Sequence, residues 1–302
     1  MPGALPILLL ALLPAAGPAG PGALLRALRQ APAGGPRAAA ATAPLHGLPY
    51  LPSALGEGRG PDPDPRFRLD AFDCMTFVET AVALGSASSL AEARAALDDV
   101  RYSGPPAIRA RNHEVMSQWL PANAARGWVA DVAAELAGPL ARREEKEFTE
   151  ASWRAVARAG RAIPGVPRSA LPLGRYGLHV VALADLPAVA GRIPAGAILF
   201  VVRADAPERP TRVSHAGVVF DGPGGRRWVR HATSTPGVAR VIEEPLERFL
   251  SRQEKALPRW PLTGISIVQI RDNRARLRSL AASGGHPPGS GRGSSPAASL
   301  LD

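Results

Sequence analysis

The chain has 302 residues, a formal net charge of +10 and a single cysteine. One cysteine excludes an internal disulfide framework and a cysteine-rich zinc site. The excess of arginine would suit nucleic acid or an anionic polymer such as a bacterial cell wall. Because basic residues form no consecutive block and do not alternate with aromatic residues, we expect no nucleic acid among the partners.

The N-terminus begins with the apolar run Leu5–Ala16. This run is too short to span a bilayer and has the length of the hydrophobic part of a signal peptide. Small residues follow it as far as Ala23, as a cleavage site requires. We therefore expect residues 1–23 to be a signal peptide and the protein to be periplasmic or secreted, with no other membrane segment. Residues 24–47 carry little signal and are expected to be a linker or one helix.

The only cysteine lies at the predicted start of a helix over residues 74–84, where apolar residues recur at a spacing of three and four. Asp73 occupies the position of the N-cap. Free N–H groups and the positive end of the helix dipole at such a position favour thiolate over thiol. Cys74 is therefore a candidate nucleophile, and the alternative is a small buried apolar residue.

The middle of the chain contains a second predicted helix from Ser89 to Val100, with Glu92 in a capping-box position. Residues 108–137 then mix polar and aromatic side chains. Trp119 and Trp128 in this stretch suit the core better than a sugar platform. Residues 142–150 are predicted to be a charged helix or surface segment.

From residue 193 onward the pattern changes to short runs typical of β-strands. The expected strands are residues 197–202, 213–220, 227–232, 238–242 and 264–270, with a hairpin loop at residues 221–225. Helices that precede an antiparallel sheet indicate an α+β fold. We expect one domain over residues 48–272 and, from its Ser, Gly, Pro and Arg content, a disordered tail over residues 273–302.

Two of the six histidines lie in neighbouring predicted strands. His215 is near the start of one strand and His231 near the end of the next. Because the strands of a hairpin are antiparallel, the two imidazoles should meet at the same end of the sheet. A thiol with two histidines suits nucleophilic catalysis, in which one imidazole is the base and the other orients it. Each histidine taken alone could equally be structural.

These motifs resemble those of the NlpC-type papain-like cysteine peptidases of bacterial cell walls, and more specifically the N-acetylmuramoyl-L-alanine amidase-like family. The resemblance covers residues 48–271. It rests on the Asp73–Cys74 helix start, the two histidine strands, Pro49–Tyr50, Arg101–Tyr102, Arg111–Asn112–His113, Trp119, Asn123 and Gly127.

The resemblance implies a papain-like fold and assigns roles to individual residues. Cys74 would be the nucleophile, His215 the general base and His231 the residue that orients it. The Cys74 backbone N–H would help to hold the oxyanion. Substrate-binding residues would be Tyr50, Asp73, Arg111, Asn112 and His113. For Asp73 a plain N-cap, and for the 111–113 triplet structural ion pairing, remain the alternatives.

The implied activity is hydrolysis of peptidoglycan or a muropeptide, at the N-acetylmuramoyl–L-alanine amide, through an acyl-enzyme. Two alternatives are cleavage of the γ-D-glutamyl–diamino acid bond and wall binding without catalysis. No cofactor is implied. We expect no metal site either, since no third ligand stands at a suitable spacing from the two strand histidines. The sequence leaves the oligomeric state open.

Overall fold

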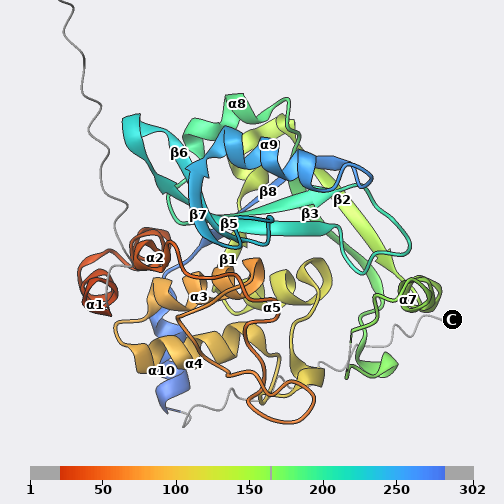
Figure 1. The fold of residues 1–302 in the computed structure, drawn as a ribbon, viewed down its shortest axis with the longest axis horizontal. Helices are drawn as coiled ribbons and strands as arrows, with labels where there is room; N and C mark the ends of the chain where they lie inside the picture. The colour runs from red at the N-terminus through yellow and green to blue at the C-terminus, as the bar shows by residue number, and fades with distance from the viewer. Residues whose placement is uncertain (1–20, 164, 283–302) are drawn as a thin grey trace, which may run out of the picture.

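The computed structural model describes residues 21–163 and 165–282, which form an α+β fold with an antiparallel sheet between two layers of helices (Figure 1). The α+β class predicted from the sequence is thus confirmed. The predicted signal peptide lies outside the described residues, apart from residues 21–23 at the start of the first helix.

The helices are α1 (Pro21–Gln30), α2 (Gly35–Thr42), α3 (Cys74–Ser86), α4 (Leu90–Arg101), α5 (Leu120–Ala125), α6 (Ala133–Ala137), α7 (Glu150–Arg158), α8 (Leu186–Val189), α9 (Leu246–Ala256) and α10 (Arg274–Ala282). The strands are β1 (Val129–Asp131), β2 (Ala141–Phe148), β3 (Gly174–Val181), β4 (Ala197–Arg203), β5 (Val213–Asp221), β6 (Arg227–Thr233), β7 (Arg240–Pro245) and β8 (Leu262–Ile270).

The sheet has the strand order β2-β3-β8-β4-β5-β6-β7, and the short β1 also pairs with β8. Strand β4 is buried along its whole length. A strand covered on both faces needs no polar side, which explains the unbroken apolar run at residues 197–202. Strand β8, the last strand of the described residues, lies inside the sheet between β3 and β4.

Each face of the sheet has its own core. Helices α3 and α4 cover one face, and α8 and α9 lie over the other (Figure 1). On the α3 side Phe77 and Ala81 pack with Ala216 and Val218, and the buried Trp119 and Trp128 belong to the same core. On the α9 side the core includes Val201, Val219, Val229, Leu246 and Phe249.

The start of α3 is fixed by a reciprocal cap. Asp73 Oδ1 accepts a hydrogen bond from the Thr76 backbone N–H at 2.7 Å, and Thr76 Oγ1 accepts one from the Asp73 N–H at 2.9 Å. The predicted role of Asp73 as an N-cap is confirmed. The cap fixes the backbone on both sides of Cys74 and leaves the thiol at the first helical position.

Two expectations for the rest of the chain need correction. Residues 141–148 form strand β2 and not a helix, because alternate side chains face in and out, with Lys146 and Phe148 buried. Its partner β3 has a clear apolar pattern only in its second half, and the sequence did not predict it.

The second correction concerns the chain ends. The prediction of a disordered tail from residue 273 is wrong for its first ten residues, because α10 packs on α4 and its Leu277 and Leu280 are buried. The rest of that tail lies outside the described residues. At the other end, residues 24–47 are mainly helical, and α2 packs on α3.

Candidate active site

The hairpin of β5 and β6 brings His215 and His231 together, as predicted. His215 Nε2 lies 2.8 Å from His231 Nδ1, and the two rings are nearly perpendicular. A bulge opposite Val201 and Val202 in β4 leaves Ser214 unpaired just before His215. His231 is fully buried, whereas His215 keeps partial solvent access. Only the first of the two imidazoles is therefore placed to meet a substrate.

A carboxylate that the sequence analysis missed completes this arrangement. Glu244 Oε1 on β7 lies 3.0 Å from His231 Nε2, and Arg252 on α9 binds Glu244 through Nε and Nη2 at 2.9 Å each. The predicted strand at residues 238–242 ended two residues short of Glu244. A strand extended by those two residues would have placed Glu244 beside the strand of His231.

The hydrogen bonds define which nitrogen of His215 is free. Burial opposes ionisation of Glu244, but hydrogen bonds from His231 and Arg252 lower its pKa to about 2. Glu244 is therefore an ionised carboxylate, which accepts hydrogen bonds and donates none. His231 must then carry its proton on Nε2. Burial lowers the pKa of His231, so the ring is neutral and its Nδ1 accepts from His215 Nε2–H. The proton-free nitrogen of His215 is therefore Nδ1, which has no hydrogen bond within the described residues.

Cys74 lies beside the strand that carries His215. Its sulfur is within hydrogen-bonding reach of the Ala216 backbone N–H and of the first N–H groups of α3. Burial, and then the charge of Asp73, raise the pKa of the thiol to about 12. The helix N-terminus alone predicts a lowered pKa, and the opposite result arises because desolvation and a neighbouring carboxylate outweigh the N–H groups. The described contacts do not include a hydrogen bond between the thiol and either imidazole.

The segment around Tyr50 forms another wall of the site. The Tyr50 N–H bonds to the Ala239 carbonyl, while Pro49 and Leu51 bond to the backbone of Phe72, two residues before Cys74. Burial, and then Cys74 and Asp73, raise the pKa of Tyr50 to about 12, so its hydroxyl is a donor at neutral pH.

The three polar residues predicted to bind substrate have partners inside the protein. Arg111 forms ion pairs with Glu57 and Asp62 at 2.6 and 2.7 Å. Asn112 bonds to Ser103 and to the Val100 carbonyl, and His113 to the Ile108 carbonyl. These contacts are the ones that the structural alternative requires, and the ion pairs of Arg111 hold its loop against the segment that follows Leu55.

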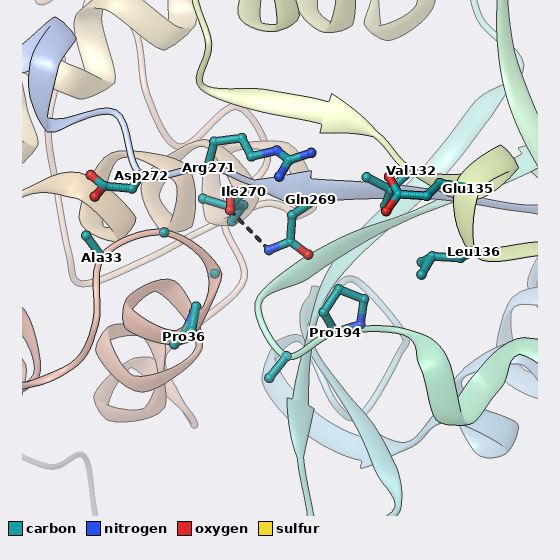
Figure 2. Close-up of a pocket in the computed structure, with 13 residues that line it drawn as sticks. Ala33, Pro36, Val132, Glu135, Leu136, Pro194, Gln269, Ile270, Arg271 and Asp272 are labelled. Atoms are coloured by element: carbon teal, nitrogen blue, oxygen red, sulfur yellow. Dashed lines mark hydrogen bonds between the residues drawn. The ribbon is translucent and has the colours of Figure 1, made fainter.

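The cavity of about 450 Å³ in Figure 2 lies away from these residues, between the α1–α2 loop, α6 and the end of β8. The Gly34 N–H in this loop donates a hydrogen bond to the Gly85 carbonyl, near the C-terminal end of α3. Because Cys74 is the first residue of α3, the cavity and Cys74 lie at opposite ends of that helix. Within residues 21–282, with 164 aside, no group of three or more His, Cys, Asp and Glu side chains is arranged for a metal ion.

Comparison with known proteins gives a family and a fold. The family model described as "AmiA-like: N-acetylmuramoyl-L-alanine amidase-like" matches residues 40–257. A crystal structure of a Legionella pneumophila protein is similar with a TM-score of 0.64 at 22% identity, over 76% of this chain and 87% of that one. An N-acetylmuramoyl-L-alanine amidase from Bacteroides uniformis has a TM-score of 0.57 at 22% identity, over 74% and 93%. No curated protein matches.

Proposed function

Since the chain belongs to the N-acetylmuramoyl-L-alanine amidase-like family, we propose that it is a cysteine amidohydrolase of bacterial peptidoglycan that acts outside the cytoplasm. The bond cleaved is the amide between the lactyl carboxyl of N-acetylmuramic acid and L-alanine. No helix in the described part of the chain is long and apolar enough to cross a membrane.

One observation carries the cysteine mechanism: the His215–His231–Glu244 chain leaves Nδ1 of His215 as the free base on the strand next to Cys74. His231 and Glu244 act as positioning residues, since they fix the tautomer and would stabilise the imidazolium that forms on His215.

The reaction then follows in two steps. Cys74 Sγ attacks the lactyl carbonyl carbon as its proton passes to His215 Nδ1, and the backbone N–H groups at the start of α3 with the Tyr50 hydroxyl stabilise the oxyanion. His215 returns the proton to the alanine nitrogen, the C–N bond breaks and the peptide leaves. Water activated by the same imidazole hydrolyses the thioester and releases the muramic acid carboxylate.

The test is digestion of purified peptidoglycan and of an N-acetylmuramoyl tripeptide, with products identified by mass spectrometry. For the wild-type protein we expect a peptide product with a free L-alanine N-terminus. The Cys74→Ala variant should give no product, and its circular dichroism spectrum should match that of the wild type. A muramoyl dipeptide product would instead indicate cleavage after γ-D-glutamate. Wall binding unchanged in Cys74→Ala, with no product from either protein, would indicate a binding protein and contradict the proposal.

A further inference from the structure

The structure has a basic groove beside the candidate active site, which we call the α9 groove. It is a cavity of about 360 Å³ lined by Thr235, Arg248, Ser251, Arg252, Lys255 and Ala256. The five residues from α9 recur at a spacing of three and four and therefore share one face of that helix. Thr235 closes the groove from the loop that follows β6.

Two chains of contacts connect this groove to the active site. Arg252 binds Glu244, which binds His231 and through it His215. On the other side the Thr235 carbonyl accepts a hydrogen bond from the Ala239 N–H, and the Ala239 carbonyl accepts one from the Tyr50 N–H. The turn from Thr235 to Ala239 therefore joins the groove to the Tyr50 wall of the active site.

The charges of the groove are not balanced. Its lining has three cationic side chains, and two of them, Arg248 and Arg252, lie against the same carboxylate, Glu244. Glu244 is already bonded to His231 and Arg252, with Arg248 at 3.6 Å from its Oε2. Lys255 has no hydrogen bond or ion pair among the residues described, and the side chain of Arg248 is 73% exposed. The groove therefore has cationic donors left for an anion.

We propose that the α9 groove binds a carboxylate of the substrate's stem peptide. The identity of this ligand rests on the proposed function, since a stem peptide is the part of a muropeptide that carries free carboxylates. Arg111, the other basic residue considered for this role, is already paired with two carboxylates. Arg248 and Lys255, with the Ser251 hydroxyl, supply charge-assisted hydrogen bonds at the rim of the site.

The experiment compares an N-acetylmuramoyl tripeptide that has free carboxylates with the same compound fully amidated. For the full-length protein we expect kcat/KM to favour the free acid about 10-fold or more. In the double variant Arg248→Ala, Lys255→Ala the ratio of kcat/KM for the free acid to that for the amide should fall to about 1, because the KM of the free acid rises. Arg259→Ala is the matched control, because it removes an exposed arginine just beyond α9 that does not line the groove, and it should keep the wild-type ratio.

Binding to Cys74→Ala, followed by calorimetry, separates this proposal from the proposed function. If Cys74→Ala binds the free acid more tightly than the amidated compound, and Lys255→Ala abolishes this difference, the groove proposal is supported. This holds even if the wild-type protein cleaves neither compound. Cleavage with no preference between acid and amide, or a preference that the Arg248 and Lys255 substitutions leave intact, would overturn the groove proposal while the amidase function stands.

Discussion

At the scale of single residues, the site combines a protonated nucleophile with a neutral base. Burial and Asp73 raise the pKa of Cys74 to about 12, while burial, and then His231, lower the pKa of His215 well below 6.5. A thiolate–imidazolium pair is therefore not the resting state of the free protein. The proton has to move to His215 as the sulfur attacks the carbonyl, which is general-base catalysis.

The pKa of His215 has a direct consequence for the pH dependence of the activity. His215 is a base only when neutral, and with a lowered pKa it stays neutral at pH 6.5 and somewhat below. Activity should be lost only as the pH falls through that lowered pKa. We expect kcat/KM on a muramoyl peptide to be constant between about pH 6.5 and 9. A midpoint for the acidic loss at or above pH 6.5 would contradict this assignment.

Glu244 provides a test of the positioning chain. Glu244→Ala removes both the charge and the acceptor, so Nε2–H of His231 loses its partner and the tautomer of His215 is no longer fixed. We expect kcat to fall about 10²-fold or more, because that is what correct general-base geometry contributes. Glu244→Gln keeps an acceptor oxygen and should lose less. Glu247→Gln, which removes an exposed carboxylate from α9, is the control and should leave kcat unchanged.

At the scale of elements, the start of α3 serves both stability and reactivity. The Asp73 carboxylate caps the helix and raises the pKa of Cys74. The two effects can be separated, because asparagine caps a helix about as well as aspartate but has no charge.

We expect Asp73→Asn to lower the pKa of Cys74 and to speed its alkylation by iodoacetamide at fixed pH, with little change in stability. Asp73→Ala should also lower the free energy of unfolding by about 1 kcal/mol, through loss of the cap. Alkylation rates are measured by intact mass and stability by urea unfolding. An Asn variant that reacts no faster than wild type would show that the Asp73 charge does not act on the thiol.

The elements that the sequence predicted correctly are those with a strong local pattern. The capped start of α3 and the apolar runs of β4, β5 and β6 are visible in short windows, and they carry Cys74, His215 and His231. Strand β2 was missed because Arg and Glu pairs two residues apart, such as Arg142 with Glu144, resemble a solvated segment when no partner strand is known. Glu244 lies two residues beyond the predicted end of its strand, and the α9 groove depends on how α9 packs, which no local pattern encodes.

At the scale of the whole molecule, the helical layer is closed by the C-terminal helix. Arg276 on α10 binds the buried Asp99 of α4 at 2.7 Å, and Asp99 also accepts a hydrogen bond from Trp128 Nε1 at 2.8 Å. Leu277 is only 6% exposed. The helix after residue 273 is therefore part of the domain and contributes to its core.

Leu277→Ala should lower the free energy of unfolding by about 2–3 kcal/mol, because it removes a buried side chain and leaves a cavity. Arg278→Ala is the matched control on the exposed side of the same helix, and a change within about 0.5 kcal/mol is expected. Equal stability of the two variants in urea would mean that α10 does not belong to the folded core.

The position of β8 determines when the protein can fold. Until residues 262–270 have left the ribosome, the growing chain has no strand to join β3 to β4, so its sheet exists only as two separate parts. Pairings between residues so far apart in sequence form slowly. The two parts of the sheet in a nascent chain therefore stay unjoined until β8 is available to pair.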